Sequence, residues 1–300
     1  MHLHASLGSF LNSLLACATL MSTETADYYG PSAIGGDLRR FAELTLTLAR
    51  TEFKLRYFGS VLGYVWSLMR PLLFFGVIYF FFVKILRIAK GPHYGVYLLT
   101  GLVLWAYFAE STAGAVTCLV TRESLLRKIR FPRLAVPLSV SLTALFNLCL
   151  SFIVVIGFAL ADGISPTPRW LELIPIVLGL VVLATGFGML LSALYVRFRD
   201  VEPIWEVALQ AWFYSSPVIY TAAAYGKLSP GFQHVALISP PATLLTQMGH
   251  AFIDPHHYPG AATVANGWPP VIAAIAIILA VFAVGWWVFA REAPRVAENL

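Results

Sequence analysis

Charged residues are scarce in this chain: Asp, Glu, Lys and Arg supply 12% of its 300 residues, about half of the usual share. The residue types A, V, I, L, M, F, W, Y and C supply 59%. A soluble protein of this length needs more charged surface to surround so much apolar material. The composition therefore excludes an ordinary soluble protein and predicts an integral membrane protein.

The chain also has few cysteines and no phosphate-binding loop motif. The three cysteines are widely spaced, which excludes a disulfide framework and a zinc site: Cys17, Cys118 and Cys149. No G-x-x-x-x-G-K-[ST] motif is present, since the only Gly-Lys pair, Gly226-Lys227, precedes Leu228. We therefore expect no catalytic residue, metal or cofactor in this chain. If ATP drives its activity, the ATPase is another polypeptide.

Six apolar stretches approach the length of about 20 residues that crosses a bilayer. They are 61–83, 96–118, 135–160, 173–195, 204–221 and 269–290. The fifth is short and breaks at Ser215-Ser216-Pro217. We expect an all-α membrane protein with six spans per protomer.

The positions of Lys and Arg predict the orientation, because cytoplasmic loops retain these residues. With both termini inside, 14 of them lie on the cytoplasmic side and five outside. The net charge of +5 is thus explained by membrane topology. Because the charges fall between apolar runs and form no basic face, we expect no nucleic-acid partner.

Four segments divide the chain. Residues 1–37 are expected to be a disordered or misassigned extension, with Met21 as the true start. Residues 38–57 carry Leu38, Phe41, Leu44 and Leu48 at helical spacing, which predicts an amphipathic helix in the cytoplasmic interface. Packing on a soluble partner is the alternative. Residues 58–292 form the six-span domain, and 293–300 form a cytoplasmic tail.

Two connecting segments have helical patterns. In the loop 121–137, apolar residues interrupt a basic run that Pro132 ends. The loop is either a basic loop that sets topology or a docking element for a cytosolic partner.

On the external side, Ser239 before Pro240-Pro241 predicts a capped helix start. Its apolar face is Leu244, Leu245, Met248 and Phe252. This helix is too short to cross the membrane, so we expect it to enter or lie on the outer leaflet. Beyond it, Asp254, His256 and His257 indicate a solvated turn more than a metal site.

Two charged residues are expected inside the membrane, Arg70 in the first span and Glu110 in the second. Such charges are neutralised by a partner or have a function. We predict that Arg70 and Glu110 form an ion pair. Arg70 either belongs to a structural pair or binds a phosphate from the cytoplasmic side, since guanidinium matches phosphate oxygens.

Aromatic residues make up 14% of the chain, and several share helical faces within the spans. Membrane interfaces account for many of them. The deeper ones suggest a channel along which sugar rings slide without a fixed register. The residues we expect to line it, together with Arg70, are Tyr64, Phe75, Tyr79, Trp205, Trp212 and Tyr220.

Four segments in this order resemble the membrane subunits of ABC-2 type transporters, in particular permeases that export O-antigen, teichoic acid, capsule and galactan-type polysaccharides. The segments are FAELTLTLARTEFKLRYFGSVLGYVWSLMRPLL (41–73), ESLLRKIRFPRLAVPL (123–138), YVRFRDVEPIWEVALQAWFYSSPVIY (195–220) and ISPPATLLTQM (238–248). The resemblance covers about residues 38–292. One departure is Ser239-Pro240, where relatives commonly carry Asn-Pro.

The resemblance implies a homodimer in the bacterial cytoplasmic membrane, with a channel between protomers, re-entrant external helices, and a cytosolic ABC ATPase dimer that holds ATP and Mg. The cargo would be a glycan on a polyprenyl diphosphate lipid. The ATPase-coupling residues would be Glu123, Leu126, Arg127, Lys128, Arg130 and Phe131, with Arg197, Arg199 and Asp200 as a second contact or an internal brace.

Two other functions remain open from the sequence. A permease for a drug or simple lipid would share the fold, with a narrower and less aromatic channel. A membrane glycosyltransferase or acyltransferase would need acidic or His residues that converge at one membrane face, whereas those of this chain are scattered.

Overall fold

The computed structural model describes residues 38–57, 61–87, 91–123, 132–227 and 230–292, and within them the chain is helical without a β-strand. The expected segments 1–37 and 293–300 lie outside the described residues. The α-helices are α2 (Leu38–Tyr57), α3 (Val61–Tyr79), α4 (Tyr94–Thr121), α6 (Ala135–Ala161), α7 (Leu173–Arg197), α8 (Val201–Ser215), α9 (Pro230–Ile238), α10 (Pro240–Phe252), α11 (Ala261–Val264) and α12 (Pro269–Glu292). Three shorter elements are a π-helix, η1 (Phe80–Ile85), and two 3-10 helices, η2 (Pro168–Glu172) and η3 (Ala222–Lys227).

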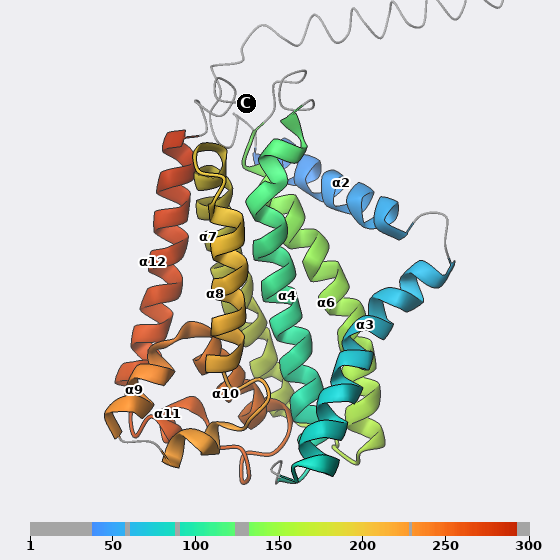
Figure 1. The fold of residues 1–300 in the computed structure, drawn as a ribbon, viewed down its shortest axis with the longest axis vertical. Helices are drawn as coiled ribbons and strands as arrows, with labels where there is room; N and C mark the ends of the chain where they lie inside the picture. The colour runs from blue at the N-terminus through green and yellow to red at the C-terminus, as the bar shows by residue number, and fades with distance from the viewer. Residues whose placement is uncertain (1–37, 58–60, 88–90, 124–131, 228–229, 293–300) are drawn as a thin grey trace, which may run out of the picture.

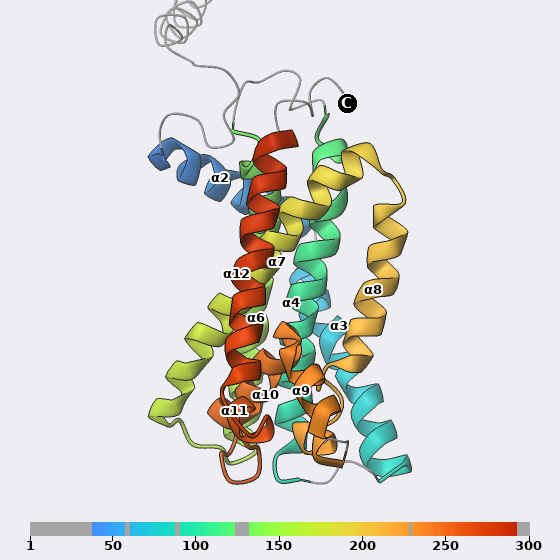
Figure 2. The same cartoon turned by 90° about the vertical axis from the view of Figure 1, so that its left-hand side faces the viewer.

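The long helices run up and down in alternation along one axis. Helices α4, α6, α7 and α12 form a bundle, and α3 and α8 stand beside it (Figures 1 and 2). Helix α2 crosses the bundle at one end, called here the α2 end. The short helices α9, α10 and α11 gather at the other end, called the α10 end (Figure 1).

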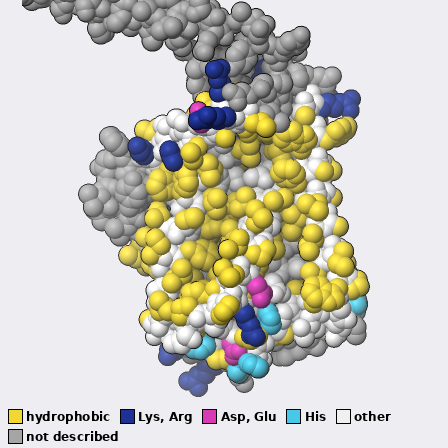
Figure 3. Space-filling view, turned by 180° about the vertical axis from the view of Figure 1, so that it is seen from behind, with side chains coloured by type: hydrophobic (Ala, Val, Ile, Leu, Met, Phe, Trp, Pro, Cys, Tyr) yellow, Lys and Arg dark blue, Asp and Glu magenta, His cyan; other side chains and the backbone are white. Residues whose placement is uncertain are grey.

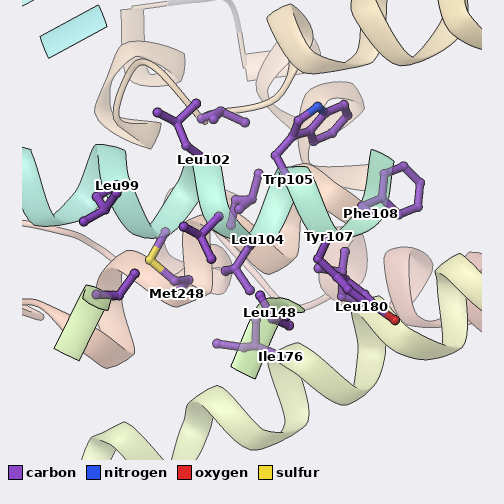
Figure 4. Packing of buried hydrophobic residues seen from close by; sticks show 14 of the residues in the cluster. Leu99, Leu102, Leu104, Trp105, Tyr107, Phe108, Leu148, Ile176, Leu180 and Met248 are labelled. Atoms are coloured by element: carbon purple, nitrogen blue, oxygen red, sulfur yellow. The ribbon is translucent and has the colours of Figure 1, made fainter. Parts of the chain in front are cut away.

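Helix α4 is the centre of the bundle. Of its 28 residues, 19 are buried, and its apolar side chains extend to several sides of the helix (Figure 4). They include Leu99, Leu104 and Phe108. This burial on several sides shows that other helices, and not lipid alone, surround α4. Helices α6 and α7 flank α4, α10 adds Met248 to its surroundings, and α3 and α8 reach it more locally.

Helices α7 and α12 approach most closely at two glycines. A Cβ atom on Gly285 of α12 would lie 2.2 Å from the carbonyl oxygen of Gly186 of α7. A Cβ atom on Gly186 would lie 2.8 Å from Cα of Phe282. The two backbones are therefore in contact, as is common for small residues between membrane helices.

Five helices in the described part of the chain are long and apolar enough to cross a membrane, where the sequence predicted six. The remaining one, α8, has 15 residues, or about 22 Å at about 1.5 Å per residue. It ends because Ser216 is extended before Pro217 (φ −91, ψ 149), as the proline favours. The six-span count therefore stays a prediction.

Helix α10 is inserted into the bundle and does not lie on its surface. Ten of its 13 residues are buried, including Leu245, Met248 and Phe252 of the expected apolar face. It contacts α7, α12 and α4. Ser239 occupies the expected cap position, but its side chain makes no cap hydrogen bond. Its Oγ instead accepts a hydrogen bond from Nε1 of Trp212, 2.8 Å away, so that α8 is attached to the start of α10.

Helix α2 has the expected bounds, but its buried face is rotated from the expected one. Thr45 and Ala49 are buried against the bundle, whereas Leu38 is 71% exposed. Phe53 packs edge to face on Phe146 of α6, with ring centroids 5.7 Å apart. The helix therefore binds α6 through small and aromatic residues, while Leu55 near its other end is exposed like Leu38.

The outer surface agrees with a membrane environment. Hydrophobic side chains cover the middle of the face seen in Figure 3, and the charged and histidine side chains gather toward its two ends. Exposed apolar residues on several helices add to this band, among them Val77, Ile153, Leu178 and Leu279. Lipid can surround such a band, whereas water cannot favourably do so.

We predict that Gly285→Ala lowers the free energy of unfolding by about 1–3 kcal/mol, because the new methyl group forces the two helix backbones apart. Denaturant titration in mixed micelles measures this change. The control is Gly157→Ala in α6, where a Cβ atom meets nothing within 4 Å; it should leave stability unchanged or raise it. Equal losses in the two variants would contradict the close crossing.

Candidate functional site

A cavity of about 840 Å³ lies between α3, α4, α6 and α8, with one residue of α2 at its edge. It exists because the first half of α3 stands away from α4 and α6 at the α2 end, while its second half joins the bundle (Figure 1). There Phe75 packs on Phe158 of α6, with ring centroids 5.6 Å apart. We call this cavity the α3–α8 cleft.

Part of the cleft is aromatic. Phe74 of α3 and Phe213 of α8 line it with ring centroids 6.5 Å apart, and they connect the two outer helices. Trp105 of α4 packs on Phe213 at 5.6 Å. Tyr107, whose hydroxyl lies 3.2 Å from Oγ of Ser141, lines another part of the wall. The sequence patterns did not single out these four residues, because their aromatic spacing does not distinguish a cleft wall from a core.

The remaining lining is polar and charged: Arg56, Arg70, Glu110, Asn147 and Ser151. The carboxylate of Glu110 pairs with the guanidinium of Arg56. It also accepts a hydrogen bond of 2.9 Å from Nδ2 of Asn147. Both donors share one oxygen of the carboxylate, Oε1, and compensate the cost of placing this charge near lipid.

The expected ion pair between Arg70 and Glu110 is wrong. Arg70 and Glu110 line the same cleft, but Arg56 takes the carboxylate. The reason is the path of the chain: the last turn of α2 brings the side chain of Arg56 within reach of Glu110 of α4. Arg70 is exposed, and it has no ion-pair partner among the residues that the structure describes.

A second ion pair joins α2 to the end of α4. Glu52 pairs with Arg122, and their side chains are only 26% and 20% exposed. Nη1 of Arg122 also donates to Oγ of Ser139 over 3.0 Å. Oγ1 of Thr143 lies 3.4 Å from Oε2 of Glu52 and 3.3 Å from the carbonyl oxygen of Ala49. Ion pairs and hydrogen bonds at successive turns thus attach α2 to α4 and α6.

The expected ATPase-coupling residues lie mostly outside the described part of the chain: Leu126, Arg127, Lys128, Arg130 and Phe131. Glu123 is described and half-buried, one residue after Arg122. Arg197 is the last residue of α7, and Arg199 and Asp200 lie in the turn to α8; all three are exposed. The guanidinium of Arg199 lies 4.9 Å from the ring centre of Tyr195, whose hydroxyl donates to Glu202 over 2.9 Å. These contacts favour an internal brace for Arg199.

The expected channel aromatics mostly pack inside one protomer. Trp205 is only 8% exposed, with its ring 4.9 Å from Phe187 and its Nε1 donating to Thr112 over 3.1 Å. Its expected place on an open channel wall is therefore wrong for this protomer. The physical reason is that α8 turns this face toward α4 and α7. Phe75, Tyr79, Trp212 and Tyr220 are half-buried, so their role in a channel stays a prediction. The side chain of Tyr64 lies outside the described residues.

Tyrosine hydroxyls complete the broken end of α8. Tyr220 and Tyr225 both donate to the carbonyl oxygen of Ser215, each over 2.8 Å. Tyr94 and Tyr97 donate to the carbonyl oxygens of Ile219 and Pro217. Carbonyl groups left without helical partners are thereby satisfied, as burial in a membrane protein requires.

The acidic and histidine residues described at the α10 end form separate pairs. Asp254 accepts hydrogen bonds from the backbone N–H of His256 over 2.9 Å and pairs with Nδ1 of His257 at 2.5 Å. The hydrogen bond with His257 is the main cause of the lowered pKa of the Asp254 carboxyl. Elsewhere at this end, Nδ1 of His93 lies 2.7 Å from Oδ2 of Asp162. The first pair closes a turn, and the second joins the start of α4 to the end of α6; among the described residues the two pairs stay separate.

We predict that Glu52→Gln lowers the free energy of unfolding by about 2 kcal/mol, because it leaves the half-buried Arg122 without its counter-charge. Denaturant titration in mixed micelles is the measurement. The matched control is Glu43→Gln, which removes a pair with Arg39 whose side chains are 65% and 88% exposed, and it should change stability by less than about 0.5 kcal/mol. A loss for Glu52→Gln no larger than the control's would contradict the attachment of α2 to α4.

Comparison with known proteins identifies the family. The sequence model of the ABC-2 type transporter family matches residues 43–250. Two proteins of Klebsiella pneumoniae named O-antigen export system permease protein RfbA are 31% and 30% identical over 214 residues, which is 71% of this chain and 81% of each relative. A Myxococcus xanthus protein of the same name is 30% identical over 243 residues, or 81% of this chain and 90% of the relative. The expected resemblance is confirmed: this multi-pass membrane protein belongs to the ABC-2 type transporter family.

Proposed function

We propose that this chain is the permease subunit of an exporter that moves a lipid-linked polysaccharide across the bacterial cytoplasmic membrane. The observation that carries the proposal is the extent of the similarity to permease proteins of O-antigen export systems, which covers 81% to 90% of their length. The substrate class is thus inferred from the relatives, and the cleft supplies chemistry that suits it.

The energy comes from a separate ATPase subunit, which holds ATP and Mg. The absence of a phosphate-binding loop in the sequence supports this part of the proposal. Energy can then reach the permease only through a contact that differs between two states. The loop 121–137 and the turn with Arg197, Arg199 and Asp200 are the proposed contacts. Two copies of the chain would enclose the channel.

The α2 end is the proposed cytoplasmic end. Arg39, Arg40, Arg122, Arg197 and Arg291 belong to segments at this end (Figures 1 and 2), and such an excess of basic residues is typical of the cytoplasmic side. Both termini are then cytoplasmic, and α10 lies near the exit.

The α3–α8 cleft is the proposed site for the diphosphate of the lipid carrier. Arg70 is exposed on its wall without an acidic partner in the described residues. A guanidinium forms bidentate hydrogen bonds with phosphate oxygens. Near lipid, a cation of this kind has either a partner or a function. Phe74, Trp105 and Phe213 offer apolar and aromatic surface beside it, which suits an isoprenoid chain and the C–H faces of sugars.

We predict that depletion of this protein in its host makes lipid-linked glycan accumulate in the cytoplasmic leaflet. Wild-type protein should restore export, and Arg70→Gln should lower the export rate about tenfold, because it removes a charge-assisted contact to phosphate. Mass spectrometry of the lipid-linked glycan and its surface labelling measure both effects.

The matched control is Arg169→Gln, since Arg169 is exposed on η2 at the opposite end; this variant should export normally. Unchanged lipid-linked glycans after depletion, with loss of a drug or a simple lipid from the export pathway, would reject the polysaccharide. Transport by the purified chain without any ATPase would reject the proposal that a separate subunit supplies the energy.

A further inference from the structure

We propose that Glu110 is an internal counter-ion that holds Arg56 in the α3–α8 cleft and that the phosphate of the cargo displaces it. This inference rests on the proposed function. It assigns to Glu110 and Arg56 a role in controlling access to the binding site, which neither the sequence pattern nor the similarity to relatives supplies.

The geometry gives the first reason. Arg56, Arg70 and Glu110 line one cleft; within the described part of the chain, Arg56 has an acidic partner, the carboxylate of Glu110, and Arg70 has none. The two side chains are 48% and 35% exposed, so neither is sealed within the protein. An anion that enters the cleft can therefore bind Arg70 directly, whereas it must compete with the carboxylate of Glu110 for Arg56.

Charge gives the second reason. The cleft holds two guanidinium groups against one carboxylate among its lining residues. A diphosphate carries more negative charge than a carboxylate and offers more acceptor oxygens, so it competes favourably for a guanidinium. A cargo whose head is neutral gains nothing from displacing Glu110. The counter-ion thereby discriminates between phosphate-bearing and phosphate-free lipids.

Asn147 gives the third reason. Its Nδ2 donates to Oε1 of Glu110 over 2.9 Å, the same oxygen that Arg56 contacts. When phosphate takes Arg56, the carboxylate keeps this donor and stays partly exposed. Displacement therefore does not leave a buried charge without a partner, which would oppose it strongly.

The test uses the assembled transporter, permease with its ATPase, in lipid nanodiscs. The probes are polyprenyl diphosphate and the corresponding polyprenol without phosphate. The measured quantity is the concentration that half-saturates the stimulation of ATP hydrolysis. Glu110→Gln should lower it for polyprenyl diphosphate about fivefold, because the competing charge is gone. Glu110→Asp, which keeps the charge, should stay near the wild-type value.

Two further variants isolate the mechanism. Arg56→Gln should raise the half-saturating concentration, and its combination with Glu110→Gln should show no gain from the second change, since the counter-ion acts through Arg56. Asn147→Ala should also raise it, about threefold, because the displaced carboxylate then loses its remaining donor. The control is Glu43→Gln on the exposed side of α2, which should match the wild type.

The outcomes separate this inference from the proposed function. If polyprenyl diphosphate stimulates the wild type and Arg70→Gln weakens it, but Glu110→Gln fails to lower the half-saturating concentration, the counter-ion is rejected and the phosphate site stands. If Glu110→Gln does not assemble, an unchanged value for Asn147→Ala rejects the counter-ion. If the wild type responds equally to polyprenyl diphosphate and polyprenol, the diphosphate cargo and the counter-ion both fail.

Discussion

The enclosure of α4 is the interaction on which the rest of the structure depends. Lipid offers no hydrogen bonds to a backbone, so each crossing segment must be a helix that satisfies itself. Helix α4 is buried over most of its length, with α6, α7 and α10 packed around it. Helices α3 and α8 cover what remains. Because α3 reaches the bundle only with its second half, this arrangement leaves the α3–α8 cleft beside the centre of the protein.

Helix α2 contacts both the end of α4, next to the proposed ATPase contact, and the α3–α8 cleft, the proposed binding site. One turn carries Glu52, which pairs with Arg122 at the end of α4, and the next carries Arg56, which pairs with Glu110 in the cleft. The segment expected to contact an ATPase follows Arg122 directly. About one turn at the C-terminal end of α2 therefore lies between the proposed driving contact and the proposed binding site, and an ion pair holds it on each side.

The sequence predicted the class of the fold well, because long apolar stretches have one stable form in lipid. It also predicted the bounds of α2 and the helix after Ser239. It predicted the site less well. Arg70 and Glu110 share the cleft as charge and depth suggested, but their pairing depended on where α2 ends in space, which no local pattern contains. Trp205 was misplaced for a similar reason: hydrophobicity marks both a channel wall and a helix contact, and only packing against Phe187 and Thr112 distinguishes them.

The early end of α8 has a consequence for the surrounding bilayer. A helix of 15 residues falls short of a hydrocarbon layer of about 30 Å, and the tyrosines that bind the carbonyl groups of Ser215 and Pro217 fix the chain in its unwound course there. Hydrophobic mismatch of this kind is relieved by thinning of the neighbouring leaflet. If α8 is the sixth span, the wall where α3 and α8 meet borders a locally thinner membrane, in which an amphiphile has a shorter apolar distance to cross.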